Sequence, residues 1–143
     1  MPYREKSNLL ALAAMLIAYV PYFVVAAMAP VQTVVAPSLL LLTLFAAVSV
    51  ARLLILGVGY LWFRIRTPED VREPADERDR AINRRSTTVA YYVLMAGTLV
   101  AVAIMPVWFA GWTIVNAGLF AIVLAEIIRC IVAAVSYRRG WNG

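Results

Sequence analysis

The stretch 112–137, WTIVNAGLFAIVLAEIIRCIVAAVSY, decides the fold that the sequence predicts. It is apolar over nearly its whole length, and its charged side chains are Glu126 and Arg129. A helix rises roughly 1.5 Å per residue, so a run of this length can cross a hydrocarbon core of roughly 30 Å. The stretch therefore predicts a membrane-spanning helix with two charges inside it.

Further apolar runs lie upstream, and they extend this interpretation to the whole chain. The sequence predicts four membrane helices, over about residues 8–29, 38–63, 75–105 (membrane part 87–105) and 112–137. The connections near Pro37 and Gly111 are short and uncharged, whereas segment 64–86 is hydrophilic. The predicted fold is all-α: a polytopic, antiparallel bundle of four transmembrane helices in two hairpins. It forms a single membrane domain, 1–143, with the third helix extended into the cytoplasm.

Composition excludes several classes of protein. Of the 143 residues, 64% are hydrophobic and 15% are charged, whereas a soluble domain has about 25% charged residues. There is no histidine, and Cys130 is the one cysteine, so an intrachain disulfide and a cysteine-based metal site are both excluded. We find no nucleophile paired with a base. The chain is therefore expected to be no enzyme, with no cofactor and no metal.

The distribution of basic residues predicts the orientation. The net charge is +5, and Lys and Arg gather in the two tails and in segment 64–86. The two other connections have none, so the positive-inside rule places both termini in the cytoplasm, with the chain in the inner membrane of a prokaryote. Lipid headgroups account for the basic excess, with Arg84 and Arg85 as candidate headgroup contacts. Direct binding of nucleic acid is not predicted.

The charged segment before the third membrane run is a candidate functional region. Acidic residues precede arginines after Pro74, which favours a helix that starts there because acids stabilise the amino end of a helix. Such a segment is either a solvated stub that fixes the topology or a docking surface for a cytoplasmic partner. The candidate partner-binding residues are Asp76, Glu77, Arg78, Asp79 and Ile82.

A resemblance also rests on this segment. The stretch 74–82, PADERDRAI, precedes a helix that contains Ala90-Tyr91-Tyr92. It resembles a family of small, poorly characterised prokaryotic membrane proteins, the DUF2178-like group, which carries an Asp-Glu-Arg-Asp/Glu-x-x-Ile signature before its third helix. Members are often encoded beside small helix-turn-helix regulators. The resemblance implies a regulatory role, with such a regulator as a cytoplasmic partner, but no established activity and no catalytic residues.

Charges inside the membrane runs are the second candidate site. A charged side chain at this depth costs roughly 2.5–3.5 kcal/mol, so it should face protein and find a partner. Arg52 follows Pro37 at the same sequence distance as Glu126 follows Gly111, which puts both about 22 Å from the outer turns. Arg129 lies one helical turn from Glu126. We expect a buried charge cluster of Arg52, Glu126 and Arg129.

Three interpretations of the cluster stay open. It can be a structural staple between helices, the arginines can instead reach the membrane surface on their own, or the cluster can be a transport or ligand site.

The function predicted from the sequence is that of a regulatory or scaffolding membrane protein that binds a cytoplasmic or membrane partner through segment 64–86. One alternative is a small transporter, alone or as a dimer, that uses Glu126 and Arg52. Another is an accessory subunit of a larger membrane complex. A homo-oligomer is compatible with each of these hypotheses.

Overall fold

The computed structural model describes residues 3–28, 35–66, 76–109 and 111–139, and all regular structure in these ranges is helical. The elements are α1 (Tyr3–Met28), α2 (Val35–Arg66), α4 (Glu77–Leu99), a π-helical turn (Val100–Ile104), a 3₁₀ turn (Met105–Val107) and α5 (Trp112–Arg138). Four helices are long and apolar enough to cross a membrane. The prediction of an all-helical chain with four candidate spans is confirmed.

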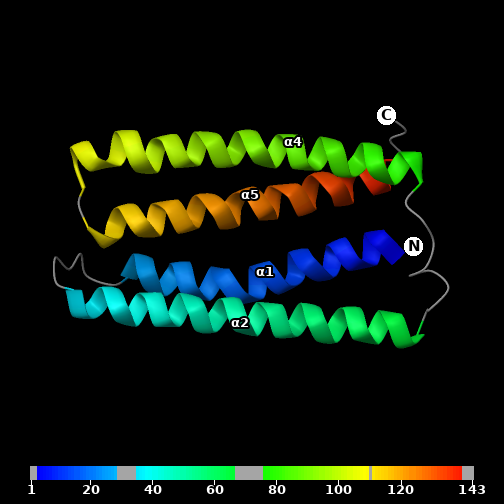
Figure 1. The fold of residues 1–143 in the computed structure, drawn as a ribbon, viewed down its shortest axis with the longest axis horizontal. Helices are drawn as coiled ribbons and strands as arrows, with labels where there is room; N and C mark the ends of the chain where they lie inside the picture. Colours follow the sequence, from blue (N-terminus) through cyan, green and yellow to red (C-terminus); the bar gives the residue numbers. More distant parts are fainter. Residues whose placement is uncertain (1–2, 29–34, 67–75, 110, 140–143) are drawn as a thin grey trace.

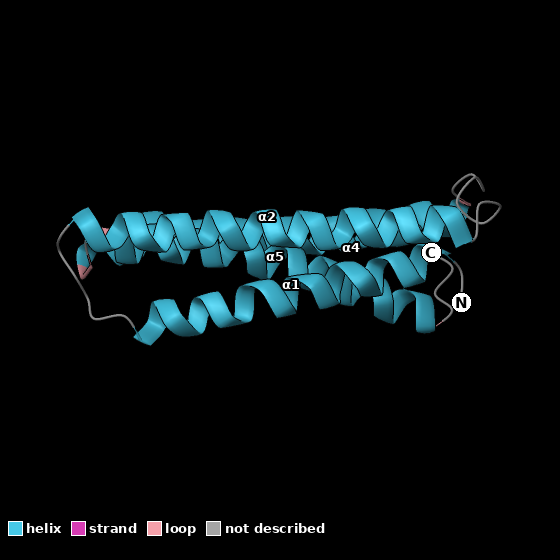
Figure 2. Cartoon of the chain, turned by 90° about the horizontal axis from the view of Figure 1, so that it is seen from below, coloured by secondary structure: helices cyan, strands magenta, loops and turns pink. Residues whose placement is uncertain are grey.

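The helices lie side by side in the order α4, α5, α1, α2, and each runs opposite to the one before it in the chain (Figure 1). The packing of α4 on α5 is the most extensive, and α1 packs on both α5 and α2. When the row is viewed end-on, α2 covers much of α5 and α4, while α1 inclines to one side (Figure 2). Within the described ranges, α2 has no extensive contact with α4 or α5.

Local chemistry explains how α4 begins and ends. The Asp76 side chain accepts a hydrogen bond of 2.7 Å from the backbone N–H of Glu77, which caps the first turn. At the other end, the helix widens into the π-helical turn and then tightens into the 3₁₀ turn that contains Pro106. Gly111 has φ +65°, a conformation that favours glycine, and it lets the chain turn back into α5.

One hydrophobic cluster of the core is built on α1 and its two neighbours. Met15 and Tyr19 of α1 pack with Val123 of α5. The ring centres of Tyr19 and Phe45 on α2 lie 5.5 Å apart. Those of Phe23 and Phe120 on α5 lie 5.1 Å apart. Aromatic side chains of α1 therefore connect the two halves of the row.

Candidate functional site

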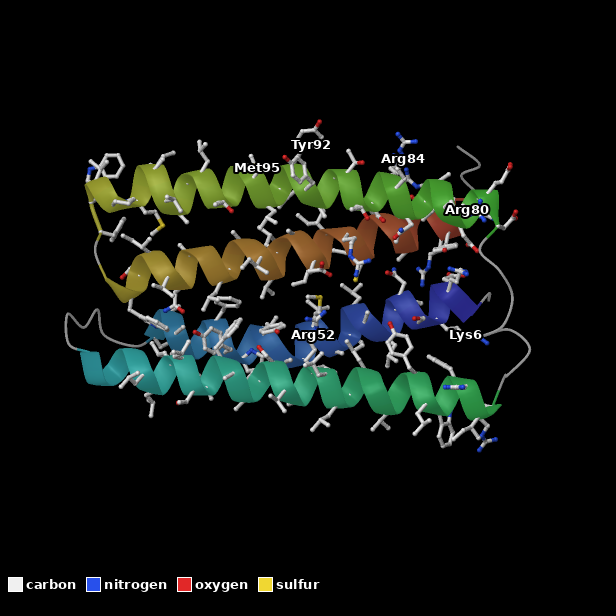
Figure 3. The ribbon with its side chains drawn as sticks, in the orientation of Figure 1. Lys6, Arg52, Arg80, Arg84, Tyr92 and Met95 are labelled. Carbon is white, nitrogen blue, oxygen red and sulfur yellow. The ribbon has the colours of Figure 1, made fainter. Side chains whose placement is uncertain are left out.

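Charged side chains gather where α1 and α4 begin and where α2 and α5 end (Figures 1 and 3). We call this part of the molecule the charged end. Lys6, Arg80 and Arg84 all lie here (Figure 3). The antiparallel order of the helices brings together groups from opposite ends of the sequence. The charged end is therefore a surface built from four helices rather than from segment 64–86 alone.

A polar network at the charged end joins three helices. Arg4 Nε of α1 lies 3.0 Å from Asp79 Oδ2 of α4. The Tyr137 hydroxyl of α5 donates to Asp79 Oδ1 at 2.9 Å, and Arg78 Nη2 donates to the Tyr137 carbonyl at 3.1 Å. We call Arg4, Arg78, Asp79 and Tyr137 the Asp79 network. Each carboxylate oxygen has a donor from a different helix, so the network fixes the beginning of α4 against α1 and α5.

These contacts correct the docking surface that the sequence predicts. Ile82 is 1% exposed and belongs to the core, so it is not available as an apolar anchor for a partner. Arg78 and Asp79 bond to other parts of the same chain. Asp76 and Glu77 remain exposed, with Asp76 also capping α4. The sequence motif alone does not separate the buried and bonded residues from the exposed ones, because successive residues on a helix point in different directions.

Replacement of Asp79 by alanine should lower the free energy of unfolding by about 1–3 kcal/mol, because the change leaves the donors of Arg4 and Tyr137 without their acceptor. Thermal unfolding of the purified full-length protein in mild detergent measures this. Glu77→Ala is the matched control, since it removes an exposed acid from the same first turn. Equal losses in the two variants would show that only the helix dipole is involved.

Two of the three charges expected to form a cluster, Glu126 and Arg129, make an ion pair on α5, whereas Arg52 contacts an aromatic ring of α1. Arg129 Nε and Nη2 donate to Glu126 Oε2 at 3.2 and 3.0 Å, one turn apart on α5. Arg52 lies between α1 and α2 (Figure 3), with its guanidinium carbon 5.8 Å from the centre of the Tyr19 ring. Its Nε is buried without a hydrogen-bond partner. No ion pair within the described residues joins Arg52 to Glu126.

The order of the helices explains this difference from the expected cluster. The expected cluster assumed that α2 and α5 are neighbours, but α1 lies between them (Figure 1). Arg52 therefore meets the aromatic face of Tyr19 rather than a carboxylate. Such a cation–π contact stabilises a cation by about 0.5–2 kcal/mol, depending on its desolvation.

Two tyrosines of α1 have roles that sequence analysis missed. The hydroxyls of Tyr19 and Ser49 lie 3.1 Å apart, which links α1 to α2. The Tyr22 hydroxyl donates to Asn116 Oδ1 at 2.8 Å, which links α1 to α5. Hydrogen bonds of this kind hold apolar helices together. The available signal was the pair of tyrosines within one apolar run, where a buried hydroxyl needs a partner.

The predicted headgroup contacts lie on α4. Arg84 and Arg85 are both exposed, and Arg84 extends away from α5 (Figure 3). For metals, the described ranges contain no group of three or more His, Cys, Asp or Glu side chains placed to hold an ion.

Four helices with the length and composition of membrane spans indicate a multi-pass membrane protein. No family model, no curated protein and no solved structure matches the chain. The resemblance of stretch 74–82 to the DUF2178-like group stays a prediction.

Proposed function

We propose that the chain is a regulatory or scaffolding protein of the prokaryotic inner membrane, without catalysis, that binds a cytoplasmic protein through one face of α4. In this proposal the helices form an antiparallel bundle, both termini face the cytoplasm, and the first turns of α4 extend beyond the hydrocarbon. The one-sided placement of basic residues at the charged end supports the orientation. A small helix-turn-helix regulator, implied by the family resemblance, remains the candidate partner.

The observation that carries the proposal is the position of α4 at the edge of the row (Figure 1). Glu77, Arg80 and Arg84 are exposed, and they follow one another at intervals of three and four residues. Residues at this spacing share one face of a helix. We call these three residues the outer α4 face. No hydrogen bond or ion pair within the described residues uses the side chain of Arg80 or Arg84.

Charge reversal of the outer α4 face tests the proposal. Arg80→Glu combined with Arg84→Glu should reduce recovery of the cytoplasmic partner about tenfold, equivalent to about 1.4 kcal/mol. A photo-crosslinker placed at residue 77 of the full-length protein in intact cells identifies the partner. Quantitative co-purification then measures its recovery with each variant.

The control for this experiment is Arg64→Glu combined with Arg66→Glu. Both residues are exposed at the end of α2, so the control makes the same change of net charge at the same end of the molecule. Equal losses with the two double variants would contradict a specific surface on α4. Absence of any crosslinked protein at residue 77 would contradict the proposal itself.

The transporter hypothesis has weaker support. Glu126 already accepts two hydrogen bonds from Arg129, and within the described residues no ion pair joins it to Arg52. The negative charge of Glu126 is therefore balanced by Arg129 on its own helix, and the carboxylate is not free to bind a transported ion. The accessory-subunit hypothesis draws on the exposure of α2, where Leu53, Leu54 and Val58 are each more than half exposed. Lipid alone also accounts for that apolar surface.

A further inference from the structure

A polar cavity of about 240 Å³ lies at the charged end, and all four helices contribute to its lining. Arg4 and Asn8 come from α1, Tyr60 from α2, Asn83 from α4 and Arg129 from α5. The cavity is partly open to the surroundings. Its volume is below the roughly 300 Å³ at which pockets for drug-sized molecules begin. It therefore suits one small polar group better than a large ligand.

The hydrogen bonds already made around the cavity determine what it can accept. Asp79 has both oxygens engaged, by Arg4 and by Tyr137. The Asn8 amide donates to the Cys130 carbonyl at 2.7 Å. The negative charge of Asp79 is thus balanced by Arg4, and both of its carboxylate oxygens already have partners within the chain.

Donors are left over in the same lining. Arg4 pairs with Asp79 through Nε, and no hydrogen bond among the described residues uses its two terminal nitrogens. Arg129 donates from Nε and Nη2 to Glu126, and in the part of the chain that the structure describes no hydrogen bond uses its Nη1. Asn83 lines the cavity from an exposed position on α4, and its amide adds a further donor. Two guanidinium groups and an amide around a small cavity match a planar or tetrahedral oxyanion.

We infer that this cavity binds a phosphate ester, the group that anionic phospholipids present at the membrane surface. The cavity lies toward the end of four helices that are long and apolar enough to cross a membrane, so in a bilayer it would face the headgroup region. A bound phosphate would bridge Arg4 of α1 and Arg129 of α5, next to the contact that joins the two hairpins. This inference does not depend on the proposed cytoplasmic partner, because it concerns a different set of residues.

Substitutions of opposite charge at Asn83 test the inference. No hydrogen bond within the described residues uses the Asn83 side chain, so its replacement breaks no such contact. Asn83→Asp should weaken lipid retention about tenfold by placing an anion in the lining, and Asn83→Lys should strengthen it. Native mass spectrometry of the full-length, delipidated protein in detergent measures retention of phosphatidylglycerol. Diacylglycerol with the same acyl chains is the comparison, since it lacks the phosphate. Thr88→Asp and Thr88→Lys are the matched controls on an exposed part of α4 outside the cavity.

A second arm identifies the source of the phosphate. Inorganic phosphate is added to the delipidated protein, and the midpoint of thermal unfolding is compared between the unaltered chain and Asn83→Asp. If phosphate raises the unfolding midpoint only in the unaltered chain, and phosphatidylglycerol is not retained, the result would support the site and assign it to a free anion. Retention of phosphatidylglycerol would support it and assign it to a lipid. Equal retention of diacylglycerol and phosphatidylglycerol with no effect of inorganic phosphate, or equal effects of the Asp and Lys variants, would overturn the inference.

Discussion

Replacement of Ile82 by alanine is expected to lower the free energy of unfolding by about 2–5 kcal/mol, the usual cost of truncating a fully buried aliphatic side chain. Ile82 is 1% exposed, between the Asp79 network and the body of α4. Its removal leaves a cavity that the surrounding helices can only partly fill. Reversible unfolding of the full-length protein in mixed micelles, followed by far-UV circular dichroism, measures the change.

Ile65→Ala is the matched control for Ile82→Ala. Ile65 also lies near the charged end, but it is 70% exposed on α2. The same chemical change should therefore have an effect within about 0.5 kcal/mol of zero. A small loss for Ile82→Ala, or losses of the same size in both variants, would contradict the packing of α4 described above.

Replacement of Gly97 by alanine is expected to destabilise the α4–α5 pair. A Cβ at Gly97 would lie 2.6 Å from Ala121 Cβ and 3.4 Å from its Cα, so the two helices would have to separate. Gly118→Ala is the control, because a Cβ at Gly118 meets nothing within 4 Å. Alanine favours a helix over glycine by about 1 kcal/mol at either site, whereas overpacking costs about 1–3 kcal/mol. Gly97→Ala should therefore be less stable than Gly118→Ala by about that overpacking cost.

A compensating change makes this prediction specific. Ala121→Gly removes the methyl group that the new side chain would meet, so combining it with Gly97→Ala should restore much of the lost stability. The interaction between the two sites follows from a double-mutant cycle measured by unfolding in the same micelles. Additive effects of the two changes would show that the helices do not approach each other here.

The sequence predicts the parts of this fold that depend on local chemistry. Apolar runs give the four candidate spans, and the acidic residues after Pro74 indicate a helix in the region where α4 begins at Glu77. The contact between Glu126 and Arg129 follows from their separation of one helical turn on α5. In each case the interacting groups lie within a few residues of each other.

Contacts between helices were not predictable in the same way. Equal depth made Arg52 and Glu126 candidates for pairing, but depth does not reveal that α1 lies between α2 and α5. The same limit applies to Asp79, whose partners Arg4 and Tyr137 are near the two ends of the sequence. Apolar periodicity does not determine the order of neighbours, because lipid-facing and protein-facing surfaces are both apolar.

The order α4, α5, α1, α2 also has a consequence for the surrounding bilayer. Four rods set in line have a longer perimeter than four rods at the corners of a square. More annular lipid molecules therefore border this chain than would border a compact bundle of the same mass, and the outermost rods each have a single protein neighbour of any extent. Bilayer thickness and lateral pressure would act most strongly on those two rods, because each rod of the inner pair packs against two protein neighbours.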